Sequence, residues 1–109
     1  MEVKADARDF NSVFENITEN SIRYEIIRIV SLLKNNSIVG EHVKREIIPK
    51  YYIKRHGVQT LYRISLPNNW RLVYSIQAFY EKEPTVLLLE LMDHKKYNKR
   101  FGYFKKKSA

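Results

Sequence analysis

Two stripes of apolar residues at helical spacing occupy the first third of the chain. The first stripe comprises Phe10, Val13, Phe14 and Ile17. The second comprises Ile22, Ile26, Ile29, Val30 and Leu33. Each follows the i, i+3, i+4 pattern of a helix with one buried face. Asp6 can cap the first helix, and Asn35-Asn36 can end the second, which begins after Asn20. Because the link from Thr18 to Asn20 is short, the pattern predicts an antiparallel helical hairpin.

Three runs of residues in the second half of the chain are typical of β-strands. They cover Leu61 to Leu66, Trp70 to Ile76 and Thr85 to Met92. The first two flank Pro67-Asn68-Asn69, a sequence that suits the turn of a short hairpin. The third is almost continuously apolar, which favours a central strand. Residues 1–5 are compatible with a short edge strand.

The segment between the helices and the strands has no persistent period, because Gly40, Pro49 and Gly57 interrupt it. We expect residues 37–60 to form an ordered basic loop. With no repeat or linker, the sequence predicts one α+β domain over residues 1–109. In it, the helical hairpin packs on a small, mainly antiparallel sheet of three to four strands. Its parts are an edge strand and the hairpin (1–36), the basic loop (37–60), the sheet (61–93) and a basic C-terminal segment (94–109).

The composition narrows the functional classes. Cysteine is absent, which excludes a disulfide framework and a thiolate metal site, and the spacing of the histidines predicts no metal site. The longest apolar run is too short to span a bilayer, and the N-terminus lacks the order of a signal peptide. We therefore expect a cytoplasmic protein that needs neither membrane nor cofactor.

Positive charge is concentrated in the second part of the chain. The net charge is +8; residues 1–40 hold five Lys/Arg against six Asp/Glu, whereas residues 41–109 hold fifteen against six. Aromatic residues lie among these cations: Tyr51, Tyr52, Tyr97, Phe101 and Tyr103. Cations can hold phosphates while aromatic rings stack on bases, so the pattern favours RNA binding. The alternative is a solvated basic face.

Residues suited to phosphate chemistry follow the third strand, which stops at Asp93-His94-Lys95-Lys96-Tyr97. Metal-free RNA cleavage needs a base, an acid and a cation that stabilises the charge on the phosphoryl oxygens. An imidazole can accept or donate a proton near neutral pH, so His94 could be base or acid, and a tyrosine can donate a proton or stack on a base. The alternative for His94 is a surface residue or a partner of Asp93. His42 and His56 are interpreted as surface residues.

Strand alternation gives Arg71 a distinct position. Trp70, Leu72 and Tyr74 share one face of their strand, and Arg71 shares the other with Val73. Arg63 lies on the same face as Arg71 in one of the possible registers. Two cations on one face repel unless an anion lies between them, which fits a phosphate-binding concavity; the alternative is two solvated arginines. We expect Tyr62, Trp70 and Tyr74 to pack against the helices.

Three segments resemble the RelE/ParE superfamily of toxins from bacterial and archaeal toxin–antitoxin pairs. They are Leu61-Tyr62-Arg63-Ile64-Ser65-Leu66, Asn69-Trp70-Arg71-Leu72-Val73-Tyr74 and Leu88-Leu89-Glu90-Leu91-Met92-Asp93-His94-Lys95. They are similar to the family's "Tyr-basic-Ile-x-Leu", "Tyr-Arg-Leu-Val-Tyr" and "apolar strand then Gly-His-Arg or Gly-Lys-Arg" segments. The resemblance covers about half the chain. Archaeal members also share segments similar to Ile48 to Tyr52. The chain departs from the pattern at Asp93, where Gly is frequent, and at Lys95, where Arg is common.

The resemblance implies a function. RelE-like members cleave mRNA in the ribosomal A site without metal, whereas ParE-like members inhibit DNA gyrase. It implies the transition-state cation at Arg71 and substrate contacts at Arg63 and Lys95, with Tyr97 and Tyr103 as candidates for the family's C-terminal tyrosine. The predicted catalytic residues are Arg71, His94, Lys95 and Tyr97. The predicted RNA-binding residues are Arg63, Lys54, Arg55, Lys96, Lys99, Arg100 and Tyr103. The expected partners are a cognate antitoxin, the ribosome and mRNA. The alternatives are a gyrase inhibitor and a non-catalytic RNA-binding protein or decayed toxin.

Overall fold

A single mixed β-sheet organises the protein, which we describe from a computed structural model covering residues 1–78 and 82–103. The last part of the expected basic C-terminal segment, residues 104–109, lies outside the described residues. The five strands lie in the order β1-β5-β4-β3-β2. Their bounds are β1 Glu2–Ala5, β2 Glu41–His42, β3 Tyr62–Ser65, β4 Arg71–Gln77 and β5 Thr85–Met92.

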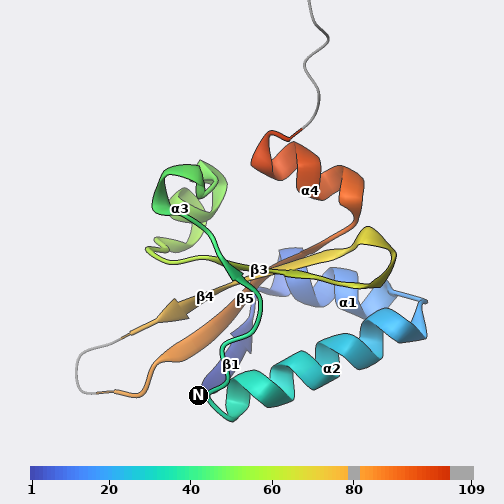
Figure 1. Cartoon of the computed structure of the whole chain (residues 1–109), viewed down its shortest axis with the longest axis horizontal. Helices are drawn as coiled ribbons and strands as arrows, with labels where there is room; N and C mark the ends of the chain where they lie inside the picture. The colour runs from blue at the N-terminus through green and yellow to red at the C-terminus, as the bar shows by residue number, and fades with distance from the viewer. Residues whose placement is uncertain (79–81, 104–109) are drawn as a thin grey trace, which may run out of the picture.

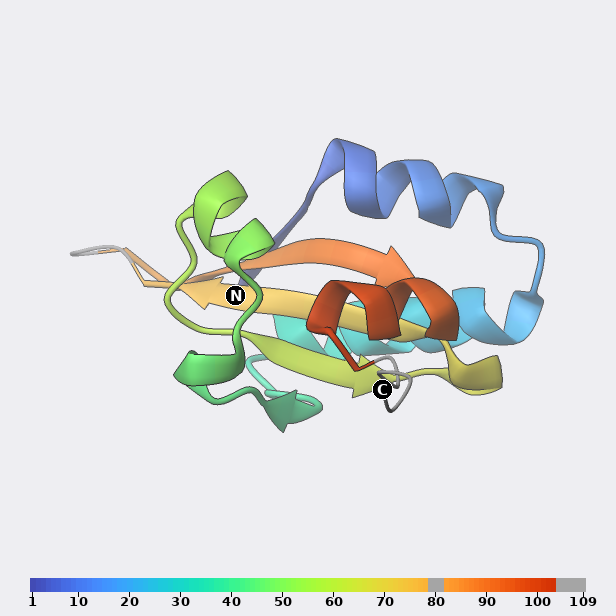
Figure 2. The same ribbon diagram turned by 90° about the horizontal axis from the view of Figure 1, so that it is seen from above.

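Helices cover both faces of this sheet. On one face lie η1 (Ala7–Asn11), which is a π-helical turn, α1 (Ser12–Asn16) and α2 (Asn20–Lys34). On the other lie α3 (Lys50–His56) and α4 (His94–Phe101), as Figures 1 and 2 show. Two 3₁₀ turns, η2 (Arg45–Ile47) and η3 (Pro67–Asn69), complete the described chain. Within residues 1–78 and 82–103, no helix combines the length and apolar character needed to cross a membrane.

The α+β class is confirmed, but the sheet is larger than expected. The N-terminal residues form the edge strand β1, which pairs in parallel with β5, and the other neighbouring strands pair antiparallel. Asp6 follows β1 and caps η1, because its carboxylate accepts the N–H groups of Arg8 (3.1 Å) and Asp9 (2.6 Å). The predicted helix ending at Asn35-Asn36 is confirmed, and Asn36 is left-handed (φ 66°).

The expectation of a loop over residues 37–60 is wrong, because this segment contains β2, η2 and α3. Helix α3 has only seven residues, too few to show a helical period. It is held by Tyr52, whose side chain is fully buried, and it ends at Gly57 in the left-handed conformation (φ 62°). The helix therefore owes its stability to the burial of one aromatic residue rather than to a long apolar stripe.

The predicted β3–β4 hairpin is confirmed. Asn68 and Asn69 both adopt positive φ (57° and 63°), as residues in a tight turn often do. The register pairs Arg63 with Val73 and Ser65 with Arg71. Side chains of directly paired residues lie on the same face, so Arg63 and Arg71 share one face of the sheet.

Strand alternation separates two hydrophobic clusters. Leu72 and Tyr74 pack with the apolar face of α2, and Tyr62 and Trp70 lie partly buried against the same cluster, as predicted. Val73 faces the second cluster, which fills the space under α3 and α4 and comprises Val43, Ile48, Tyr52, Val58, Leu61, Val73, Leu89, Met92 and Tyr97. Arg71, on the same face as Val73, therefore points to the side of the sheet that carries α4.

A β-bulge changes the alternation of β5. Val73 pairs with Glu90, whereas Tyr74 pairs with Leu88, so that Leu89 has no partner of its own. The extra residue lets Leu89 and Glu90, although adjacent, both face the side of α3 and α4. The bulge therefore directs a carboxylate into an otherwise apolar layer.

Candidate functional site

A small polar concavity lies between β3, β4 and the end of α4. Its volume is about 290 Å³, and it is lined by Glu41, Arg63, Ser65, Arg71, Tyr97 and Tyr103. The hairpin register brings Arg63, Ser65 and Arg71 to one face, and α4 adds the tyrosine Tyr97. The concavity therefore collects two cations, two phenols and one carboxylate.

Arg63 is the centre of this site. Its Nη1 donates to the hydroxyl oxygens of Tyr97 and Tyr103, both at 2.9 Å, and its Nε donates to Glu41 Oε1 at 2.8 Å. Burial by itself lowers the pKa of Arg63, but the bonds from its guanidinium to Tyr103 and Glu41 outweigh burial, so that its pKa is raised. Arg63 is therefore a fixed cation in a fixed orientation.

Arg71 has no acidic partner among the residues that the structure describes. Its Nη1 donates to the carbonyl oxygen of Trp70 at 3.1 Å, and its guanidinium carbon lies 5.3 Å from the centre of the Tyr97 ring. Among residues 1–78 and 82–103, no Asp or Glu side chain lies within 4.0 Å of its guanidinium nitrogens. Its other N–H groups can therefore bind an anion that enters the concavity.

Tyr97 is suited to donate a proton. Its side chain is buried, and burial raises the pKa of its phenol although Arg63 and Arg71 nearby oppose the shift. The phenol is therefore neutral near pH 7. Because Arg63 donates to its oxygen, the phenol O–H is free to point towards a ligand.

Glu41 supplies the carboxylate of the site and was missed by the sequence analysis. It follows Gly40, which adopts φ +90°. A Cβ at this glycine would lie 2.5 Å from the carbonyl oxygen of Arg63 and 2.7 Å from Cγ1 of Ile64. Only glycine allows this approach, and it brings Glu41 against Arg63. The sequence signal that could have pointed to Glu41 was a glycine directly before an acidic residue in a basic segment.

The predicted catalytic residues His94 and Lys95 do not line the concavity. His94 is exposed on the first turn of α4, where its Nε2 lies 3.0 Å from Nδ2 of Asn98. It lines a separate groove with Lys95, Asn98 and Lys99. Of the four predicted catalytic residues, the structure thus brings together Arg71 and Tyr97, and it adds Arg63 and Tyr103 from the predicted RNA-binding set.

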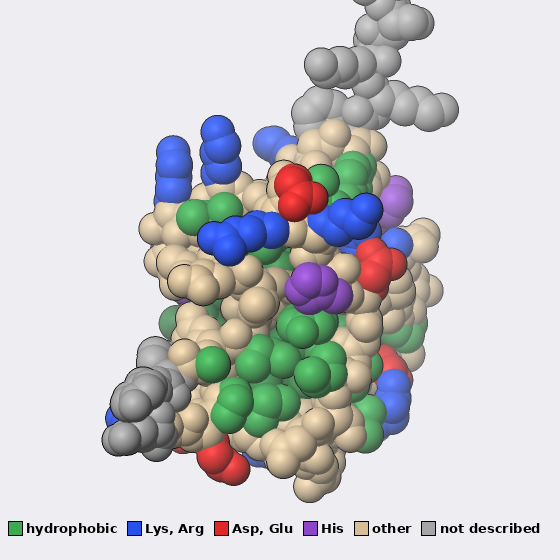
Figure 3. All heavy atoms as spheres, turned by 60° about the vertical axis from the view of Figure 1, so that its left-hand side comes forward, with side chains coloured by type: hydrophobic (Ala, Val, Ile, Leu, Met, Phe, Trp, Pro, Cys, Tyr) green, Lys and Arg blue, Asp and Glu red, His purple; other side chains and the backbone are tan. Residues whose placement is uncertain are grey.

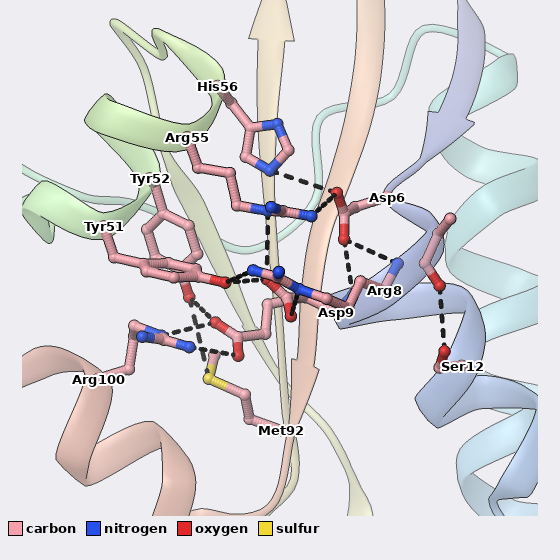
Figure 4. Close-up of polar contacts among 12 residues, drawn as sticks. Asp6, Arg8, Asp9, Ser12, Tyr51, Tyr52, Arg55, His56, Met92 and Arg100 are labelled. Atoms are coloured by element: carbon pink, nitrogen blue, oxygen red, sulfur yellow. Dashed lines mark hydrogen bonds and ion pairs between the residues drawn. The ribbon is translucent and has the colours of Figure 1, made fainter.

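Two predicted RNA-binding arginines form intramolecular ion pairs (Figure 4). Arg55 donates to Asp6 at 3.0 Å, and its Nε lies 3.5 Å from the carboxylate of Asp9. Arg100 donates to both carboxylate oxygens of Glu90, at 2.9 and 3.0 Å. Lys96 lies 3.6 Å from the same carboxylate, whereas Lys54 is exposed on α3.

The carboxylate of Glu90 anchors α4. The residue is fully buried, and besides Arg100 it accepts a hydrogen bond from the hydroxyl of Tyr52 at 2.6 Å. Burial and the neighbouring Glu90 charge raise the pKa of Tyr52 far above that of a free phenol. This network ties β5, α3 and α4 together, and it holds Tyr97 over the sheet.

His56 is not the surface residue that we expected. Only 14% of its side chain is exposed, and its Nε2 lies 3.5 Å from Oδ1 of Asp6 (Figure 4). Asp6 thus contacts both Arg55 and His56 while it caps η1. His42, by contrast, is exposed as predicted, with its ring against the edge of Tyr62.

A comparison with protein-family models, curated proteins and solved structures gives no match to this chain. Within the described ranges, no group of three or more His, Cys, Asp or Glu side chains has the geometry of a metal site. The function must therefore be argued from the residues of the concavity.

Proposed function

We propose that the protein is a RelE-type toxin, an endoribonuclease that cleaves mRNA on translating ribosomes and so inhibits translation in the cytoplasm. The observation that carries the proposal is Arg71, an arginine without an acidic partner in the described part of the chain, which shares a concavity with Tyr97 and Arg63. These residues lie in, or directly after, the segments that resemble the RelE/ParE superfamily. The proposal extends to a RelE-like fold with an N-terminal helical hairpin.

The concavity suits transesterification of RNA. The phosphate binds to Arg71 and Arg63, which compensate the charge on its non-bridging oxygens. The 2′-oxygen attacks phosphorus, and its proton passes to the carboxylate of Glu41. The bond from phosphorus to the 5′-oxygen breaks, and Tyr97 donates a proton to that oxygen. The products are a 2′,3′-cyclic phosphate and a 5′-hydroxyl.

The phosphate also displaces Glu41 from Arg63 in this scheme. In the unbound protein, Arg63 pairs with Glu41, so that the carboxylate occupies the position of an anion. When the phosphate takes over Arg63, Glu41 becomes free to accept a proton. This assigns the role of base to Glu41, whereas the sequence analysis named His94 as a catalytic residue that could be base or acid, and His94→Ala is the variant that separates the two assignments.

Such a site should be slow on free RNA. A carboxylate is a weak base, and the raised pKa of Tyr97 makes it a weak acid. Precise alignment of the 2′-oxygen then has to supply a large share of the rate. A translating ribosome can provide that alignment by holding the mRNA in a defined conformation.

Primer extension on an mRNA in a translating extract tests the proposal. We expect new 3′ ends inside codons with the wild-type protein, none with Arg71→Ala, and almost none on the same mRNA without ribosomes. Equal cleavage of free and ribosome-bound mRNA would contradict the role of the ribosome. An absence of cleavage together with loss of gyrase supercoiling activity would favour a ParE-like function.

The toxin proposal also implies an antitoxin. Among the exposed large hydrophobic residues, Tyr24 and Ile27 lie on α2 and Ile38 follows it. Figure 3 shows a face on which hydrophobic side chains gather below Lys and Arg side chains. An amphipathic helix with acidic flanks would complement such a surface. Its binding should weaken with salt if the charges dominate; a complex insensitive to ionic strength would be held by apolar contacts instead.

A further inference from the structure

A second and larger cavity is lined by residues of α3 and α4 and of the turns that precede them. Both helices lie on the same side of the sheet as the concavity (Figure 1). Its volume is about 670 Å³, within the ~300–1,000 Å³ typical of ligand sites. It is lined by Pro49, Lys50, Tyr51, Asp93, Lys95, Lys96, Lys99 and Arg100. None of these residues lines the concavity around Arg71. We refer to this cavity as the α3–α4 cleft.

The cleft carries positive charge without matching acids. Across residues 1–78 and 82–103, the ammonium groups of Lys50, Lys95 and Lys99 have no carboxylate within 4.0 Å. The carboxylate of Asp93, at the same opening, caps α4 by accepting the N–H of Lys96 at 2.8 Å. Three cations therefore surround a cavity in which one acid is already engaged, and this arrangement attracts anions.

One wall of the cleft is a preformed stack of two planar groups. The guanidinium of Arg100 lies 3.5 Å from the centre of the Tyr51 ring, and the edge of that ring meets Tyr52. Glu90 fixes Arg100 by two hydrogen bonds. The hydroxyl of Tyr51 bonds to Asp9 and accepts a hydrogen bond from Arg8 at 3.0 Å. A ligand that stacks here does not have to order these side chains, so little conformational entropy is lost on binding.

We propose that the α3–α4 cleft is a second RNA site, which binds one or two nucleotides of single-stranded RNA. A base stacks against the Tyr51–Arg100 pair, and the adjoining phosphates contact Lys50, Lys95 and Lys99. The lysines without acidic partners in the described chain, together with a rigid planar wall, favour a nucleotide as the ligand. An acidic peptide would contact the lysines but would have no base to stack on the Tyr51–Arg100 pair. This inference rests on the proposed function only for the choice of RNA as ligand.

Helix α4 connects the two sites. Its Tyr97 faces the concavity, and its Lys95 and Lys99 face the cleft, so that one strand of RNA can contact both sides of the helix. A strand held in the cleft would supply binding energy remote from the reacting phosphate, which helps to align the 2′-oxygen.

The test is the binding of a fluorescein-labelled single-stranded RNA decamer, methylated on every 2′-oxygen to prevent cleavage, measured by anisotropy over a range of salt. The double variant Lys50→Gln/Lys99→Gln should weaken binding about tenfold or more. Because two phosphate contacts are lost, the slope of the logarithm of the association constant against log salt should become less negative by about 1.4. The matched control is Lys4→Gln/Lys34→Gln, which removes two exposed charges from β1 and α2. It should change affinity less than about twofold.

A second pair of variants tests the stack. Tyr51→Leu should weaken binding about 5- to 150-fold, because base stacking is lost. Tyr51→Phe keeps the ring and loses only the hydroxyl bonds to Asp9 and Arg8, so it should weaken binding much less. Three results would each overturn the proposal. The two double-lysine variants could have equal effects, the Leu and Phe variants could bind equally well, or polyglutamate could compete as effectively as unlabelled RNA. Cleft-dependent binding without ribosomal cleavage would leave the cleft assignment standing and refute the nuclease.

Discussion

Arg63 donates a hydrogen bond to the phenol oxygen of Tyr97 at 2.9 Å, across 34 positions of the sequence. The bond joins β3 to α4. It also holds the Tyr97 ring where its face meets the guanidinium of Arg71, at 5.3 Å. Arg63 therefore positions both the candidate acid and, through the ring, the candidate transition-state cation.

Arg71→Ala should abolish activity without unfolding the protein. Loss of a preorganised charge clamp slows comparable reactions by roughly 100- to 1,000-fold, or about 2.7–4 kcal/mol of transition-state stabilisation. Loss of the contact with the Tyr97 ring should cost only about 0.5–1 kcal/mol of stability. Arg71→Lys keeps the charge but not the planar fork, so it should restore part of the rate. Growth inhibition, ribosome-dependent cleavage and thermal melts check this. Full toxicity of Arg71→Ala would remove this residue from the mechanism.

Tyr97→Phe should lower single-turnover cleavage by about 10²- to 10⁴-fold, the usual contribution of a general acid. Because burial raises the pKa of the phenol above its ordinary value of 10, the wild-type acid stays mostly protonated up to about pH 9.5. The wild-type rate should therefore show no loss on the alkaline side between about pH 7 and 9.5. A decline centred in that interval would mean that another group is the acid, and Tyr103→Phe is the matched comparison.

Glu41→Gln should change binding and chemistry in opposite directions. Removal of the negative charge frees Arg63 for phosphate, so that RNA binding should tighten, whereas loss of the proton acceptor should slow cleavage about 10²-fold or more. Anisotropy with a non-cleavable RNA and single-turnover cleavage measure the two effects separately. If both binding and cleavage improved, Glu41 would be only an inhibitor of Arg63.

The buried pair of Glu90 and Arg100 should show strong coupling in denaturant unfolding. Glu90→Leu leaves Arg100 without its bidentate acceptor and Tyr52 without its hydrogen-bond partner, and it should cost about 3–5 kcal/mol. Arg100→Leu should cost less, because Lys96 remains 3.6 Å from the carboxylate. The double variant should be more stable than Glu90→Leu alone. Additive losses would show that the two charges do not depend on each other.

Asp6 should make the stability depend on pH in the acidic range. Burial opposes the shift, but the N–H of Asp9 and the neighbouring Arg55 outweigh it and lower the carboxyl pKa below 3.8. A carboxyl group whose pKa is lower in the folded state than in the unfolded state stabilises the fold at a pH above its unfolded-state pKa. This stabilisation is lost as the pH falls through its folded-state pKa. Asp6→Asn keeps a capping oxygen and should cost about 1–3 kcal/mol near pH 7. In urea unfolding, the difference from wild type should shrink below about pH 4; a constant difference would contradict the assignment.

The periodic parts of the fold could be predicted because their apolar pattern is long enough. The stripe from Ile22 to Leu33 predicted α2, and alternation around Arg71 predicted which residues face the helices. The sequence left several registers of β3 against β4 open, and one of them places Arg63 and Arg71 on the same face. The turn at Asn68 and Asn69 produces that register.

Other features depend on contacts between distant residues and leave no local pattern. Helix α3 is held by Tyr52, which reaches Glu90 from 38 positions away. The bulge at Leu89 that directs Glu90 towards α4 is invisible in a continuous apolar run. Glu41 was overlooked because its role comes from the close approach of Gly40 to β3. His94 was grouped with Tyr97 because they are close in sequence, but only Tyr97 lines the concavity.

The pairing of β1 with β5 sets an order on assembly during synthesis. Glu2–Ala5 leave the ribosome well before their partners Thr85–Leu88, which lie far downstream in the sequence. Until then, the N-terminal strand has no parallel neighbour, and the Glu90 carboxylate that anchors α4 does not yet exist. A nascent chain that has not reached α4 therefore lacks both Tyr97 and its support, so the concavity can form only once β5 and α4 have been synthesised. A polypeptide that stops before α4 thus carries no completed copy of the site.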